Sequence, residues 1–153
     1  MIFDVAIVGA GVIGSMVARE LTRYKVSVCM LEQENDVACG ASRANSGIIH
    51  GGYDPEPGTL KAKLNTIGVE LLFDTAKELN VPCIRNGSLV CAFSEEENEA
   101  VRELYGRGRE NNIAQLKILS GDEARAIEPK LSQAVTSALY VPTAGIIPPT
   151  PPE

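Results

Sequence analysis

Three glycines near the N-terminus constrain the fold of this chain more than any other feature. They stand in the pattern G-x-G-x-x-G, at Gly9, Gly11 and Gly14. A short, β-branched apolar run at residues 4–8 precedes them, and apolar residues at helical spacing follow. A second strand-like run comes at residues 26–31. This order predicts a β-α-β unit of a parallel sheet, with the glycines in the first turn.

Each glycine of such a turn has a separate task. Gly9 permits the tight turn, Gly11 leaves room for a pyrophosphate, and Gly14 lets the helix pack closely on the strand. The N–H groups and the positive end of the helix dipole then face the phosphates. Glu32 ends the second strand, where a carboxylate can accept hydrogen bonds from ribose hydroxyls. An acid there disfavours the 2′-phosphate of NADP, so the pattern predicts FAD or NAD.

The overall composition favours a small-molecule partner. The chain has 153 residues and a formal net charge of −6, which gives no basic surface for nucleic acid. The four cysteines have neither the spacing nor the histidine neighbours of a metal site, so we expect none. We interpret Cys29 and Cys91 as reduced core residues and expect a cytoplasmic protein. No apolar run is long enough to predict a transmembrane segment.

The first helix is expected from Gly11 to Tyr24, and a long stretch without periodicity follows at residues 33–59. A loop of that length within a compact domain is usually functional. The next helix is expected to begin after Thr59. Its apolar residues form one stripe, which consists of Leu60, Leu64, Ile67, Leu71 and Leu79.

Two capping patterns predict the later helices. Ser94 with Glu97 predicts a helix to about Asn112, and Ser120 with Glu123 predicts a shorter one before Pro129. Strands are expected at residues 88–93, 116–119 and 138–141.

Four segments together resemble a known family: GAGVIGSMVAREL, CGASRANSGIIHGGYDPEPGTLKAKL, NGSLVCAFSEEE and ALYVPTAGII. They are similar to the FAD-dependent oxidoreductases of the D-amino-acid oxidase superfamily, and within it to the branch of glycerol-3-phosphate dehydrogenase and L-2-hydroxyglutarate oxidase. The resemblance extends to about Ile147.

The resemblance implies an α/β fold with a Rossmann-like FAD-binding region at residues 1–79. It also implies the beginning of an α+β substrate domain at 80–142. Residues 143–153 are assigned as a truncated, proline-rich end, and the chain departs from the family pattern after about Ile147. We therefore expect the N-terminal part of a longer enzyme, with little turnover by itself.

The resemblance also implies a set of cofactor-binding residues. The adenine end of FAD is assigned to Gly9, Gly11, Ile13, Gly14, Glu32 and Gln33. The pyrophosphate and the flavin side are assigned to Ala41, Ser42, Asn45, Ser46, Gly47 and Ile48. For Ser42 and Asn45, capping of a short helix is an alternative that is compatible with cofactor contact.

His50 is the one histidine of the chain, and the resemblance places its backbone near the flavin ring. It is our candidate catalytic residue. Three roles stay open: accepting the proton of a substrate hydroxyl, donating a hydrogen bond to the flavin, or covalent attachment of the flavin.

The function that these features predict is oxidation of the CH–OH group of a small anionic substrate, with hydride transfer to flavin N5. Glycerol-3-phosphate is the first substrate candidate, an L-2-hydroxy acid the second, and an amine or amino acid the third. The electron acceptor is left open. The alternatives are an NAD-dependent dehydrogenase domain and a truncated dinucleotide-binding remnant without activity.

Overall fold

The computed structural model describes residues 2–147. The chain divides into two compact units, with the division between Ser46 and Gly47. Each unit has strands and helices of its own. The functional boundary that we placed at residue 79 stays a prediction.

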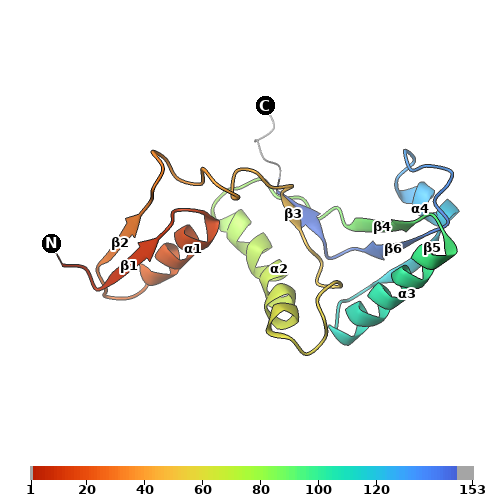
Figure 1. Ribbon diagram of the computed structural model, residues 1–153, viewed down its shortest axis with the longest axis horizontal. Coiled ribbons are helices and arrows are strands. Elements are labelled where there is room, and N and C mark those ends of the chain that lie inside the picture. The colour runs from red at the N-terminus through yellow and green to blue at the C-terminus, as the bar shows by residue number, and fades with distance from the viewer. Residues whose placement is uncertain (1, 148–153) are drawn as a thin grey trace. The chain divides into compact units, whose positions relative to one another are not determined.

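The first unit is the predicted β-α-β motif. It contains β1 (Val5–Val8), α1 (Val12–Leu21) and β2 (Val28–Leu31), shown in red to orange in Figure 1. The two strands are parallel and pair from Val5 with Val28 to Val8 with Leu31. The predicted parallel βαβ arrangement is therefore confirmed, with each element one to four residues shorter than expected.

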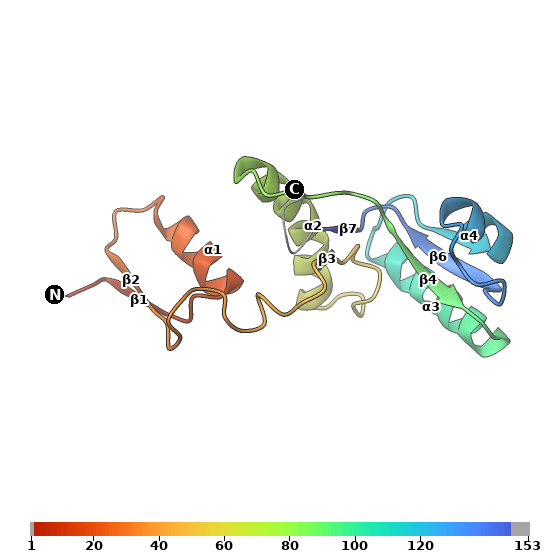
Figure 2. The same ribbon diagram turned by 90° about the horizontal axis from the view of Figure 1, so that it is seen from above.

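The second unit contains a three-stranded antiparallel sheet. Its strands are β4 (Ser88–Ala92), β6 (Ser137–Val141) and β5 (Lys117–Ser120), in that spatial order. Two helices pack on this sheet, α3 (Glu95–Glu110) and α4 (Gly121–Ile127), as both Figure 1 and Figure 2 show. The predicted α+β character of this region is confirmed.

The core of the second unit lies between α3 and the sheet. Leu139 and Val141 of the central strand are fully buried, and Val101 of the helix packs with them. Ile113 and Leu116, from the segment after α3, belong to the same cluster. Burial of such side chains stabilises a domain by about 1.5–3 kcal/mol each, so this cluster holds the helix on the sheet.

Two strands were missing from the prediction. β3 (Ile48–Ile49) lies in the long loop, and β7 (Gly145–Ile146) lies near the end of the described chain. They pair antiparallel, with Ile48 opposite Ile146. This pairing ties the loop that carries His50 to the segment ALYVPTAGII, which the resemblance had treated as separate.

The helix α2 (Leu60–Glu78) begins as predicted, because the hydroxyl of Thr59 accepts a hydrogen bond from the Ala62 N–H at 3.2 Å. The residues of α2 that are buried differ from those that the apolar periodicity predicts. The face that is buried carries Ala62, Val69 and Ala76. The predicted apolar stripe is largely exposed, and this includes Leu60, Leu64, Ile67, Leu71 and Leu79.

Two glycines on one helix allow a matched test of the packing of α3. A Cβ at Gly106 would meet no atom within 4 Å, whereas one at Gly108 would overlap the Leu116 side chain and lie 3.1 Å from the Tyr53 Cβ. We expect Gly106→Ala to stabilise the chain by up to about 1 kcal/mol through helix propensity. Gly108→Ala should cost about 1–3 kcal/mol through overpacking. Urea unfolding followed by circular dichroism measures both, and equal effects of the two changes would contradict the described packing.

Candidate cofactor site

The glycine-rich turn has the geometry that its spacing predicts. Gly9 has a φ of 100°, which side-chain-bearing residues rarely adopt, and its N–H donates to the Leu31 carbonyl at 2.7 Å. This hydrogen bond extends the pairing of β1 and β2 into the turn. The chain therefore passes from β1 into α1 through a tight turn.

Gly14 lies where the helix approaches that turn most closely. A Cβ built on Gly14 would overlap the carbonyl oxygen of Gly9 and lie 3.3 Å from Cγ2 of Ile7. The close approach of helix and strand thus depends on glycine at this position.

Gly11 differs from the other two glycines. It is the N-cap residue of α1 and has an ordinary extended backbone, with φ −73° and ψ 179°. A Cβ there would meet the Ser42 hydroxyl oxygen at 3.1 Å. With no side chain, Gly11 leaves room for the Ser42 hydroxyl at the N-terminus of the helix.

Glu32 is turned towards the glycine-rich turn. Its carboxylate accepts hydrogen bonds from the N–H of Ala10 at 2.7 Å, of Gln33 at 2.8 Å and of Glu34 at 3.2 Å. These bonds, that from Ala10 above all, lower the pKa of Glu32, so the carboxylate is ionised at neutral pH. The side chain therefore links the end of β2 to the turn, a structural role that the sequence analysis did not foresee.

A pocket of about 180 Å³ lies beside this carboxylate. Five of the predicted cofactor residues line it: Gly11, Glu32, Gln33, Ala41 and Ser42. The pocket thus brings together an anion-attracting helix N-terminus, an acceptor carboxylate and a hydroxyl.

Ser42 joins the distant loop to the helix. Its hydroxyl oxygen accepts a hydrogen bond from the Val12 N–H, the first of α1, at 2.8 Å. Ser42 therefore caps α1 and not a short helix of its own. Asn45 turns back instead, and its amide donates to the carbonyls of Ala41 at 3.1 Å and Ser42 at 2.8 Å.

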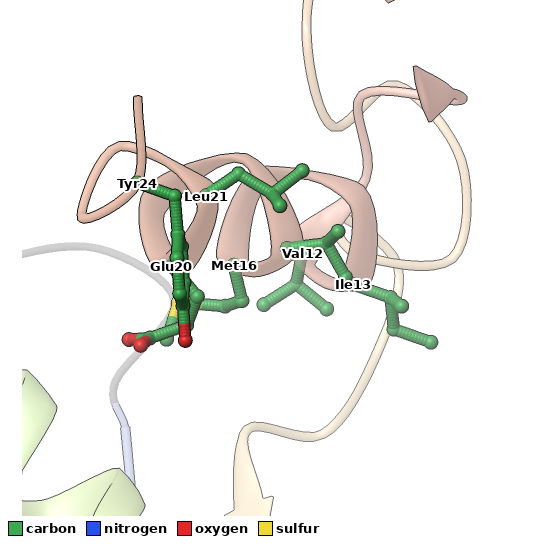
Figure 3. Close-up of a pocket in the computed structure, with 7 residues that line it drawn as sticks. Val12, Ile13, Met16, Glu20, Leu21 and Tyr24 are labelled. Carbon is green, nitrogen blue, oxygen red and sulfur yellow. The ribbon is translucent and has the colours of Figure 1, made fainter. Parts of the chain in front are cut away.

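Ile13 does not line this pocket. Its side chain lies on an apolar face of α1, along a shallow groove of about 480 Å³. Figure 3 shows this face, which carries Val12, Ile13, Met16, Val17, Glu20, Leu21 and Tyr24. No side chain of α1 is buried, so its apolar face is a prominent exposed surface of the first unit.

The remaining predicted residues divide between the two units. Ser46 is an exposed residue that ends the first unit. Gly47, Ile48 and His50 belong to the second unit, where the Gly47 carbonyl accepts the Ile147 N–H at 2.8 Å. His50 is exposed and directly follows β3.

Four lining residues of the pocket were missing from the predicted set, namely Glu34, Ala38, Cys39 and Gly40. They come from the turn between β2 and Ser42. The Ala38 N–H donates to the Ala10 carbonyl at 3.1 Å, which brings this turn back to the glycines. Ala38 has a φ of 58°, a left-handed conformation that is uncommon for alanine. The sequence therefore does not indicate the turn that brings these residues to the pocket.

Neither a metal cluster nor a membrane span is found in the described part of the chain. Among residues 2–147, no group of three or more histidine, cysteine, aspartate or glutamate side chains is arranged to hold a metal ion. Within the same range, no helix has the length and apolar character needed to cross a bilayer.

The lowered pKa of Glu32 leads to a testable pH dependence. Because the pKa is lower in the folded chain than its ordinary value of 4.5, this carboxylate stabilises the first unit above that pH. The contribution is lost as pH falls through the folded pKa. We expect Glu32→Gln to increase amide exchange of β1 at pH 7, and the difference from the unaltered chain to shrink below about pH 4.5.

The matched control is Glu34→Gln, since the Glu34 carboxylate accepts a hydrogen bond from the Gln33 side chain at 3.2 Å. It should leave the exchange of β1 unchanged. A difference for Glu32→Gln that stays constant down to pH 3 would contradict the assignment.

Comparison with known proteins agrees with this geometry. The family model described as FAD dependent oxidoreductase matches residues 4–150. A glycerol 3-phosphate dehydrogenase of Caloramator mitchellensis is 48% identical over 147 residues, which are 96% of this chain and 31% of that protein. A mitochondrial L-2-hydroxyglutarate dehydrogenase of Dictyostelium discoideum is 39% identical over 149 residues, which are 95% of this chain and 33% of that protein.

A solved structure extends the likeness to three dimensions. The dithionite-reduced L-α-glycerophosphate oxidase of Mycoplasma pneumoniae, with FAD bound, matches with a TM-score of 0.88 and 36% identity. The match covers 96% of this chain and 39% of that one. A glycine oxidase of Geobacillus kaustophilus matches with a TM-score of 0.85 and 28% identity, over 95% of this chain and 40% of that one.

The glycine turn, the acidic residue at the end of β2 and these matches define the class: the chain belongs to the family of FAD-dependent oxidoreductases. The prediction of FAD as the cofactor is thereby confirmed, and NAD is not supported. The chain spans about a third of the length of the two curated relatives named above.

Proposed function

We propose that this chain forms the FAD-binding part of an enzyme that oxidises the CH–OH group of a small anionic substrate, with glycerol-3-phosphate as the first candidate. The observation that carries the proposal is the pocket beside Glu32, which joins an acceptor carboxylate to the N-terminus of α1. The relatives named above as acting on glycerol 3-phosphate or L-2-hydroxyglutarate support the substrate class.

The described residues fit the adenosine and phosphate parts of FAD. A side chain at Gly11 would crowd the start of α1, where its Cβ would meet the Ser42 hydroxyl oxygen at 3.1 Å, and the positive end of the α1 dipole favours phosphate there. Glu32 is ionised and acts as an acceptor, which suits ribose hydroxyls. In this proposal, Ser42 and the N–H groups at the start of α1 hold the pyrophosphate.

When bound, FAD would supply the electron sink for the hydride that leaves the substrate carbon. The chain's own residues supply position and proton transfer. His50 accepts the hydroxyl proton in this proposal, since an imidazole nitrogen can act as a general base. The exposed position of His50 at the end of β3 leaves its ring accessible for this task.

The experiment is a flavin reduction assay without oxygen. Both the 153-residue chain and the complete translated product of its gene are mixed with FAD, and the loss of flavin absorbance near 450 nm is followed after addition of substrate. Glycerol-3-phosphate, L-2-hydroxyglutarate and glycine are compared, with D-2-hydroxyglutarate as the stereochemical control.

We expect glycerol-3-phosphate or L-2-hydroxyglutarate to reduce the flavin of the complete product. Reduction by glycine alone would replace the hydroxyl substrate with an amine. Tight FAD binding by the complete product without reduction by any substrate would favour the inactive remnant. Each of these two outcomes would contradict the proposed activity but would leave the membership of the family unaffected.

A further inference from the structure

We propose that Asn111 is a positioning residue for His50, because it holds the backbone of the segment that follows His50. The inference rests on the proposed function for its catalytic consequence, but its structural part stands on the contacts of the second unit alone. Asn111 lies far from His50 in the sequence, and no motif pointed to it.

Asn111 is the one polar residue in the buried part of the described chain, with an exposed fraction of 9%. It ends α3 as the C-cap residue, and its backbone N–H donates to the Arg107 carbonyl at 2.8 Å. Its side chain is therefore not needed to complete the helix. The amide nitrogen of that side chain donates instead to the carbonyls of Gly52 at 3.1 Å and Pro55 at 2.8 Å.

The two carbonyls that Asn111 binds belong to a segment without regular secondary structure. Gly51, Gly52 and Pro55 are nevertheless buried. A buried carbonyl needs a hydrogen-bond donor, and an irregular segment cannot supply one from its own strand or helix. The Asn111 amide meets this need at two points and so determines the path of the chain between them.

Further contacts hold the same segment from the other side. The Thr143 hydroxyl, in the turn between β6 and β7, donates to the Gly51 carbonyl at 3.2 Å. Gly52 has a φ of 85°, and a Cβ on it would lie 2.7 Å from Cδ1 of Ile113. Tyr53 packs on the main core cluster. The residues that follow His50 are therefore fixed both to α3 and to the sheet.

The position of His50 follows from these anchors. On its N-terminal side, β3 pairs with β7, and on its C-terminal side Gly51 and Gly52 are held as described. His50 is thus the exposed residue between two fixed points. Loss of the Asn111 amide would remove the hydrogen bonds to Gly52 and Pro55 while leaving the imidazole chemically unchanged.

The test uses the fact that the chain has one histidine, which gives a single C2–H proton resonance in NMR. Asn111→Asp keeps the size of the side chain but replaces the donor with an acceptor that faces two carbonyls. Asn112→Asp is the matched control. The exposed Asn112 side chain donates one long hydrogen bond, at 3.4 Å, to the Glu110 carbonyl, and the substitution adds the same charge one residue away.

We expect Asn111→Asp to move or broaden the His50 C2–H resonance and the amide resonances of Gly51 and Gly52, and Asn112→Asp to leave them in place. Amide resonances of Leu119 and Ala138, which belong to the other core cluster, report whether the unit is still folded. If Asn111→Asp fails to fold, Asn111→Ala removes the same donor without adding a charge, and the same resonances then test the inference.

In the FAD-loaded complete product, Asn111→Asp should lower kcat by about 10- to 100-fold through misplacement of His50. KM should change less than kcat. Unmoved loop resonances in a folded variant would overturn the inference, as would moved resonances with an unchanged kcat. If the resonances move but the unaltered enzyme reduces no flavin, the proposed function fails and the anchoring of the loop stands.

Discussion

His50→Gln should lower kcat of the FAD-loaded enzyme by about 10²–10⁴-fold, the range by which general bases accelerate reactions. Glutamine keeps a polar side chain of similar length but cannot accept a proton near neutral pH. Because His50 is exposed, the change leaves the packing of the second unit intact. Stopped-flow measurement of flavin reduction under saturating substrate gives the rate of the chemical step.

The other roles considered for His50 give different results in the same variant. If His50 only hydrogen-bonds the flavin, the absorbance spectrum of bound FAD shifts while the loss of rate stays small. If His50 carries FAD covalently, acid precipitation removes the flavin from the variant but not from the unaltered protein. A variant with unchanged kcat, unchanged spectrum and unchanged flavin retention would exclude all three roles.

Gly11→Val should weaken FAD binding by about 100-fold or more, which corresponds to about 2.7 kcal/mol. The branched side chain would crowd the N-terminus of α1, where the pyrophosphate is proposed to lie. The backbone angles of Gly11 suit valine, and the one close neighbour of its Cβ is the end of the Ser42 side chain. We therefore expect a folded protein without cofactor, which equilibrium dialysis and circular dichroism together detect.

Gly14→Ala is the informative comparison for Gly11→Val. Its Cβ would overlap the backbone of Gly9, so any loss of FAD should come with loss of structure in the first unit. Unweakened FAD binding by a folded Gly11→Val variant would show that this turn does not cradle the phosphates.

Local patterns were sufficient to predict the cofactor-binding motif. The spacing of Gly9, Gly11 and Gly14, the strand-like runs on both sides and the acid at Glu32 all act within a short length of chain. The helix starts at Thr59 and Ser120 were predictable for the same reason, since a cap needs only residues within one turn. Each of these features depends on neighbours in the sequence, which a pattern records.

Other features depend on which distant segments meet, and the tertiary structure alone decided them. Periodicity showed that Leu64 and Leu71 share a face of α2, but packing buried the opposite face at Val69. The pairing of β3 with β7 and the two hydrogen bonds of Asn111 join residues that are far apart in the chain. Such contacts form because buried carbonyls need hydrogen-bond donors and apolar surfaces need apolar neighbours, and the folded chain supplies both from distant segments. The sequence around an asparagine at the end of a helix therefore does not indicate which loop it holds.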